Sequence, residues 1–163
     1  MLVGACGSAP SQPAQAPVAP VVLDPVTLQV TLIASQDVNP DVRGRASPLS
    51  VRILELRSRS AFDAADFFSL YDRDQATLGT ELLAKEQYIL RPGDTQGYTR
   101  KAQAETRFLG VVAAYRDLEG STWRVAVGIA PPAPPVRNAP PARQRVTIRC
   151  ARAGVEIEMS AAA

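Results

Sequence analysis

The chain has 163 residues, which is enough to bury one hydrophobic core but hardly two. Its 18 basic and 16 acidic residues leave a net charge of +2, which is too balanced for the basic surface of a nucleic-acid-binding protein. Histidine does not occur, so the commonest general base near neutral pH and the histidine-dependent nucleophile pairs are excluded.

The N-terminal residues predict a lipid anchor. Gly4 and Ala5 precede Cys6, as small residues do at the cleavage site of a bacterial lipoprotein signal peptide, where the cysteine thiol accepts the lipid. We interpret residues 1–5 as a residual signal peptide and Cys6 as the lipidation site, although no charged or long apolar region precedes them. The alternative is an apolar N-terminus that frays. Gly7 stands where an aspartate would indicate inner-membrane retention, which favours the outer membrane.

Residues 6–25 predict a tether that ends at the folded domain. The stretch after Cys6 has five prolines and few large side chains, so it cannot form a core. A proline-rich chain extends by about 3.1 Å per residue, which would hold the domain up to roughly 60 Å from the lipid. No apolar run of about 18 residues follows Cys6, so no transmembrane helix is expected.

Residues 26–163 are expected to form one β-sandwich domain. Apolar residues alternate with threonine and glutamine over residues 26–34, which is typical of a half-buried strand. Similar patterns predict further strands over residues 49–56, 86–90, 107–115, 122–130, 145–150 and 155–159. Short turns join 107–115 to 122–130 and 145–150 to 155–159, so these pairs predict hairpins and antiparallel sheets.

One segment breaks the strand pattern. Ser60 to Asp63 resembles a helix-capping arrangement, and apolar residues follow at roughly helical spacing. They are Phe62, Ala65, Phe67, Phe68, Leu70 and Tyr71, followed by Leu78, Leu82 and Leu83. We predict one short helix that packs on the sandwich; a ligand groove built from the aromatic residues is the alternative. The sequence from Arg91 to Asp94 predicts a type II turn, because proline and glycine occupy its two central positions.

Few residues offer catalytic or metal-binding chemistry. Asp63 and Asp66 could do acid–base work or bind calcium, but acidic residues at the start of a helix are the simpler interpretation. We therefore predict a protein that is not an enzyme and that holds no metal and no cofactor apart from the covalent lipid on Cys6. Cys150 follows two apolar residues on the inward side of a strand, which predicts a buried thiol; a disulfide with Cys6 is the alternative.

Two features near the C-terminus allow more than one interpretation. The prolines over residues 131–141 indicate a stiff connection, or a polyproline segment that a groove could recognise. Five arginines follow or lie within it: Arg137, Arg143, Arg145, Arg149 and Arg152. They indicate a solvated sheet face balanced by Glu156 and Glu158, or a surface for anionic head groups or a partner.

Several ordered blocks together are similar to the TssJ lipoproteins of type VI secretion systems. They are the segment ending in Cys6, the strand Leu28–Ser35, Asn39-Pro40-Asp41, Gly44-Arg45, Pro48–Ile53, Phe62–Tyr71, Leu78-Gly79, Leu82-Leu83, Leu90, Pro92-Gly93, Gly110-Val111 and Tyr115–Asp117. The resemblance implies a transthyretin-like, two-sheet antiparallel β-sandwich with a short helical insertion between the second and third strands.

The resemblance also implies a function and a partner. It implies a lipoprotein on the periplasmic face of the outer membrane that recruits the periplasmic C-terminal region of TssM, an inner-membrane protein, into a complex that TssL completes. The alternative is a periplasmic lipoprotein that binds a small ligand or glycan, or that inhibits a periplasmic enzyme.

The loop between the first two strands is the part of the chain that the resemblance assigns to TssM binding. Its residues are Gln36, Asp37, Val38, Asn39, Pro40, Asp41, Val42, Arg43, Gly44, Arg45, Ala46 and Ser47. Its turn-forming residues would hold it in shape, and Arg43 and Arg45 would offer forked donors to carboxylates on a partner. The alternative is a solvated connecting loop.

Overall fold

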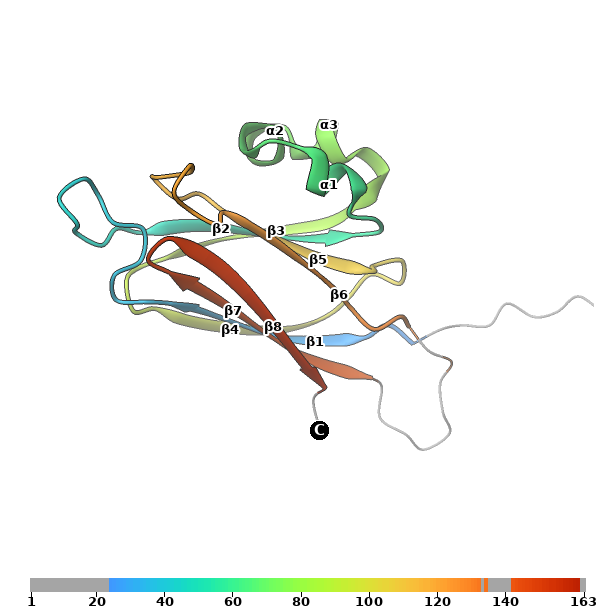
Figure 1. The fold of residues 1–163 in the computed structure, drawn as a ribbon. Helices are drawn as coiled ribbons and strands as arrows, with labels where there is room; N and C mark the ends of the chain where they lie inside the picture. The colour runs from blue at the N-terminus through green and yellow to red at the C-terminus, as the bar shows by residue number, and fades with distance from the viewer. Residues whose placement is uncertain (1–23, 133, 135–141, 162–163) are drawn as a thin grey trace, which may run out of the picture.

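The fold is a sandwich of two four-stranded sheets, seen in a computed structural model that describes residues 24–132, 134 and 142–161. The strand orders are β4-β1-β7-β8 and β3-β2-β5-β6, and Figure 1 shows the two sheets as stacked layers. The strands are β1 (Thr27–Ala34), β2 (Leu49–Leu56), β3 (Leu82–Leu90), β4 (Thr95–Lys101), β5 (Phe108–Ala113), β6 (Arg124–Gly128), β7 (Arg143–Ala151) and β8 (Gly154–Ala161). The predicted two-sheet β-sandwich is confirmed.

The main core lies between the two sheets and follows from the alternation of β1. Leu28, Val30 and Leu32 are buried, while the threonines and glutamine between them are partly exposed. Fully burying a side chain of this size stabilises the fold by about 1.5–3 kcal/mol. Val51 of β2 and Ile148 of β7 belong to the same buried cluster, so three strands far apart in sequence share it.

One strand pairing differs from the antiparallel arrangement that we predicted. β1 pairs with β4 in the antiparallel sense but with β7 in the parallel sense, with Val30 opposite Val146. The other strand pairs named here are antiparallel, including the predicted hairpins β5–β6 and β7–β8. Alternation shows which face of a strand is buried but not the direction of its neighbour, because parallel and antiparallel pairs both place alternate side chains on one face.

The sequence did not predict β4, and it predicted β3 too short. β4 is an edge strand whose inward positions are Gln96, Tyr98 and Arg100, so only one of them carries a largely apolar side chain. Tyr98 stacks on Tyr88 of β3, with ring centroids 5.5 Å apart. The turn between these strands is the predicted type II turn, since Gly93 has φ +81° and the Asp94 amide donates to the Arg91 carbonyl.

The helical insertion lies between β2 and β3, as predicted, but it is not one helix. It contains α1 (Ser60–Ala64), α2 (Phe67–Asp72), α3 (Asp74–Leu78) and a 3₁₀ turn, η1 (Gly79–Glu81), and the stripe residues Leu82 and Leu83 belong to β3. The predicted cap at Ser60 is wrong, because the side-chain cap occurs at α2, where Asp66 accepts a hydrogen bond from the Ser69 amide. Extended backbone at Ala65 and non-helical backbone at Arg73 separate the three helices.

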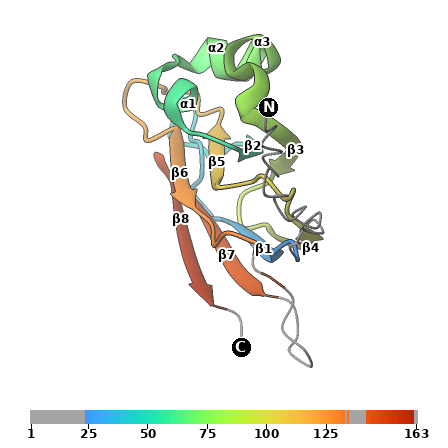
Figure 2. The same ribbon diagram turned by 90° about the vertical axis from the view of Figure 1, so that its right-hand side faces the viewer.

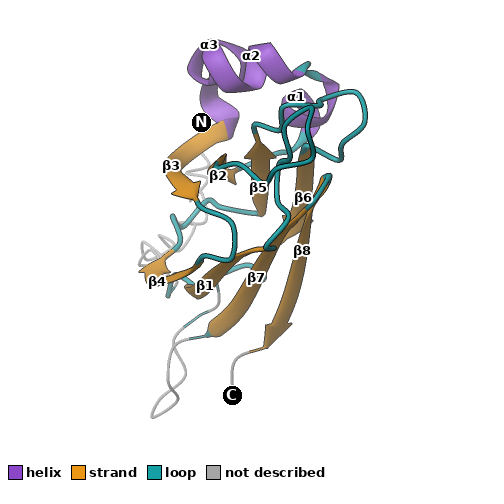
Figure 3. Cartoon of the chain, turned by 90° about the vertical axis from the view of Figure 1, so that its left-hand side faces the viewer, coloured by secondary structure: helices purple, strands orange, loops and turns teal. Residues whose placement is uncertain are grey.

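The insertion covers the outer face of the sheet that contains β2. Figures 2 and 3 show the three helices gathered on that side of the molecule, away from β1, β7 and β4. Phe62, Leu70 and Leu78 are buried there against Leu54 and Leu56 of β2. The aromatic residues therefore mainly form a second core, and only Phe68 among them is largely exposed.

Cys150 is buried, as predicted, with 1% of its surface exposed. Burial raises the pKa of its thiol to about 12, because the thiolate would lose its hydration. Residues 1–5, Cys6, the predicted tether up to residue 23 and most of the 131–141 segment lie outside the described residues.

Candidate partner-docking site

The predicted docking loop begins and ends on the sandwich core. Val38 is fully buried in the main core cluster, and its carbonyl accepts a hydrogen bond from the Ser47 amide at 3.1 Å. Figure 1 shows the loop projecting from the end of the sandwich opposite the start of β1. The loop is therefore closed at its base and extends from the far end of the domain.

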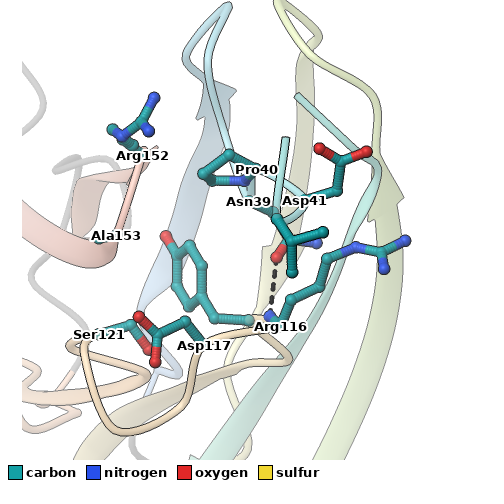
Figure 4. Close-up of a pocket in the computed structure, with 10 residues that line it drawn as sticks. Asn39, Pro40, Asp41, Arg116, Asp117, Ser121, Arg152 and Ala153 are labelled. Carbon is teal, nitrogen blue, oxygen red and sulfur yellow. Dashed lines mark hydrogen bonds between the residues drawn. The ribbon is translucent and has the colours of Figure 1, made fainter. Parts of the chain in front are cut away.

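Asn39 fixes this loop to two other loops at the same end. Its side-chain amide donates to the Pro48 carbonyl at 2.8 Å, and its side-chain oxygen accepts the Arg116 amide at 2.8 Å (Figure 4). Its backbone amide donates to the Arg152 carbonyl at 3.3 Å. Asn39 has φ +49°, a conformation that asparagine adopts more readily than most residues.

The tip of the loop is a second closed unit. The Asp41 amide donates to the Arg45 carbonyl, and the Gly44 amide donates to the Asp41 carbonyl, both at 2.8 Å. The Asp41 carboxylate accepts the amides of Arg43 and Arg45 and the Nε of Arg45. The hydrogen bond from the Arg45 side chain is the main cause of a lowered pKa at Asp41.

These contacts change the roles expected for the two loop arginines. The Arg45 guanidinium is paired with Asp41, with a shortest N–O distance of 2.7 Å, so it stabilises the tip before any partner arrives. Arg43 is exposed, and no ion pair or side-chain hydrogen bond joins its guanidinium to another described residue. Val42 beside it has 104% relative exposure, as high as in an extended chain. The tip therefore presents one apolar and one cationic side chain.

A pocket of about 520 Å³ lies beside the loop, where three connections meet. Figure 4 shows Pro40 and Asp41 from the loop, Arg116, Asp117 and Ser121 from the β5–β6 connection, and Arg152 and Ala153 from the β7–β8 turn. Asn39, Val42 and Tyr115 complete its lining.

Local hydrogen bonds hold the walls of this pocket in place. The Tyr115 hydroxyl donates to the Ala151 carbonyl at 3.0 Å, and burial raises the pKa of this phenol. Asp117 accepts the Gly120 amide at 2.9 Å, which shapes the turn below the pocket. The Arg152 side chain approaches Asp37 at 4.0 Å, so it links the turn to the loop weakly.

The loop was predictable from the sequence, but the residues that surround it were not. Arg116, Asp117 and Ser121 lay in the turn between two predicted strands, and the first two also belonged to a block that carries the family resemblance, but none of them was assigned to the site. Arg152 was one of five arginines. No local pattern could have joined them to Asn39, because Arg116 lies 77 positions further along the chain. Within the described residues, no group of three or more acidic or cysteine side chains could hold a metal ion. No helix in that part of the chain is long and apolar enough to span a membrane.

Comparisons with known proteins identify the class of this sandwich. The T6SS lipoprotein TssJ1 from Pseudomonas aeruginosa is 33% identical with a TM-score of 0.76, over 85% of this chain and 99% of that chain. Lip from Serratia marcescens, a membrane-bound component of the type VI secretion system, is 29% identical with a TM-score of 0.72, over 82% of this chain and 96% of that chain. A chain of a structure described as a type VI membrane complex is 24% identical with a TM-score of 0.66, over 82% of this chain and 98% of that chain, which shows a shared fold alone.

The family assignment follows from a match along most of the domain. A family profile described as type VI secretion lipoprotein, VasD, EvfM, TssJ, VC_A0113 matches residues 26–152. A search of the curated proteins gave no match. The chain belongs to the type VI secretion lipoprotein family, which confirms the resemblance drawn from the sequence.

Proposed function

We propose that this protein is a docking lipoprotein of the type VI secretion membrane complex. Lipid on Cys6 would anchor it to the periplasmic face of the outer membrane. Its loop over residues 36–47 would bind the periplasmic C-terminal region of TssM, and through TssM it would join TssL. It would catalyse no reaction and would need no metal or cofactor apart from the covalent lipid.

The observation that carries this proposal is the braced loop tip. Val42 and Arg43 project from a backbone that Asp41, Gly44 and Asn39 already hold, so binding would cost little further loop ordering. Arginine is among the residue types enriched at interface hot spots, and Val42 beside it offers an exposed apolar side chain that a partner could bury. The loop also lies at the end of the sandwich away from the start of β1, where a partner from across the periplasm would arrive.

Calorimetric titration tests the proposal. The full chain with Cys6→Ser would be titrated with the periplasmic C-terminal region of the TssM from the same genome. Burial of a valine side chain contributes about 1.5–3 kcal/mol, so Val42→Asp should weaken binding by at least about 10-fold. Arg43→Glu should also weaken binding. Because this loss is electrostatic, it should be largest at low salt and shrink as salt is added.

A matched control comes from another exposed apolar residue. Ile89 of edge strand β3 is 64% exposed and lies outside residues 36–47, so Ile89→Asp makes the same kind of change outside the loop tip and should leave the affinity unchanged. Arg45→Glu is a poor test of contact, because it breaks the pair with Asp41 and disturbs the tip. Unchanged affinity in folded Val42→Asp and Arg43→Glu variants would refute the loop as the docking site. Loss of saturable binding in Ile89→Asp alone would place the docking site outside the loop.

The pocket supports a second candidate function, a lipoprotein that binds a small ligand or glycan. Its volume of about 520 Å³ lies in the range of ligand sites, and polar and apolar groups converge on it. Ala153→Phe would narrow this pocket without changing the loop tip. If that variant lost binding of a chitin oligosaccharide that the unchanged protein binds, while TssM affinity was absent, the ligand function would replace docking.

A further inference from the structure

The outer face of the β4-β1-β7-β8 sheet carries a basic patch at one end. The side chains of Lys101 on β4 and of Arg143 and Arg145 on β7 are exposed, and alternation places them on the face that points away from the core. In the register, Thr27 of β1 stands between Lys101 and Arg143, and Gln29 stands opposite Arg145. These three cationic residues are called the basic patch below.

The strand geometry keeps the patch compact. Neighbouring strands lie about 4.8 Å apart, so Lys101 and Arg143 are about 10 Å apart at their Cα atoms. Arg145 lies two residues, or about 7 Å, further along β7. Three cations therefore occupy an area comparable with a few phospholipid head groups.

Carboxylates do not neutralise the patch within the described residues. None of the ion pairs there includes Lys101, Arg143 or Arg145. The carboxylate nearest along the same face is that of Glu158, which stands opposite Thr147, one outward row from Arg145, and it pairs with Arg149 instead. Glu105 pairs with Arg57, and the buried Glu55 pairs with Arg100. The sequence adds no acidic residue over 1–23 or 135–141, but it does add Arg137.

The opposite end of the same face has a different charge. Arg149 lies four residues after Arg145 on β7, towards the docking loop. It pairs with Glu158 at 3.7 Å and stands opposite Glu156 in the register. The face is therefore cationic where the chain enters β1 and close to neutral or acidic where β1 leads into the loop. The cationic end is therefore the end that the chain from the proposed anchor enters, and the other end carries the proposed docking loop.

The chain that leads from Cys6 enters the fold inside the basic patch, at Thr27. We propose that the basic patch binds the phosphate groups of anionic phospholipids in the membrane that holds the lipid anchor. The sandwich then stands with its docking loop turned away from that membrane. The proposal rests on the proposed lipidation of Cys6, but not on the identity of the protein partner.

The tether makes a weak interaction sufficient. A basic residue near an anionic membrane surface raises affinity roughly fivefold, so three of them contribute roughly 100-fold. A flexible tether keeps the patch at a high local concentration near the lipid, so contact forms without a large intrinsic affinity. The interaction is electrostatic, so salt should weaken it.

The two lysines of the chain allow a direct test. Lys101 belongs to the patch, whereas Lys85 of β3 pairs with Asp74 on the helix-covered side of the other sheet. The full chain would be coupled through Cys6 to maleimide lipids in vesicles of phosphatidylcholine, with or without phosphatidylglycerol. Cys150 should stay unmodified because it is buried. Acetylation rates of both lysines would then be followed by mass spectrometry.

Phosphatidylglycerol should slow acetylation of Lys101 by about threefold or more while Lys85 changes little, and high salt should remove the difference. Arg143→Gln with Arg145→Gln should abolish the protection, whereas Arg149→Gln, on the same strand and face, should retain it. Equal changes at both lysines, or protection that persists in the double variant, would overturn the proposal. No TssM is present, so failure here leaves the docking function untouched.

Discussion

Replacing Asn39 should loosen the docking site. Asn39→Ala removes the hydrogen bonds to the Pro48 carbonyl and from the Arg116 amide. Each is worth about 1 kcal/mol, and more where the abandoned partner stays buried. Alanine at φ +49° adds about 1 kcal/mol of backbone strain, so the total loss is about 3–4 kcal/mol.

Asn39→Gly separates the two contributions. Glycine loses the same two hydrogen bonds but adopts the positive φ without strain, so its loss should be about 1 kcal/mol smaller than that of alanine. Both variants would be measured by urea unfolding of the full chain with Cys6→Ser, followed by the fluorescence of Trp123, the single tryptophan.

Hydrogen exchange of the Arg116 amide supplies a local measurement. This amide donates to the Asn39 side chain, so its protection should fall in both variants even where global unfolding is rare. A loss of less than about 1 kcal/mol in Asn39→Ala, together with an Arg116 amide that stays protected, would refute the role of Asn39 in bracing the loop.

Three further predictions concern the loop tip, the second core and the buried thiol. Phe62→Ala should lower the free energy of unfolding in urea by about 3–5 kcal/mol, because Phe62 of α1 is buried against the sheet. Gly110→Ala would place a methyl group 2.9 Å from the Phe62 ring and should cost about 1–3 kcal/mol. That cost should be smaller in a Phe62→Leu background. The pKa of Asp41 is lowered in the folded tip, so its bonds stabilise the tip fully above the unfolded pKa of 3.8 and are lost as pH falls through the lower, folded pKa. An NMR titration of Asp41 should show a midpoint below 3.8 that rises in Arg45→Gln. A midpoint that does not change in this variant would contradict the pairing. In a Cys6→Ser chain, Cys150 should react with a thiol reagent only after unfolding, and fast reaction of the folded chain would show that the thiol is accessible.

The outer limits of the docking site were predictable from local signals. The strand over residues 49–56 has the predicted bounds, and β1 differs by one residue from its prediction. Both carry apolar residues at positions that face the core, so their sequence alone indicates the loop between them. The Pro92-Gly93 turn was predictable for the same reason, because its conformation depends on two adjacent residues.

What the chain by itself determined is therefore most of its strands, the Pro92-Gly93 turn, its buried Cys150 and, through several ordered blocks, its family. Only the tertiary structure decided the parallel pairing of β1 with β7, the place of edge strand β4 and the division of the insertion into three helices. It also decided that Asn39 meets Arg116 and that Lys101 and Arg143 flank Thr27. Periodicity and turn chemistry are local, whereas these arrangements depend on which distant strands lie side by side, and that depends on packing the whole core.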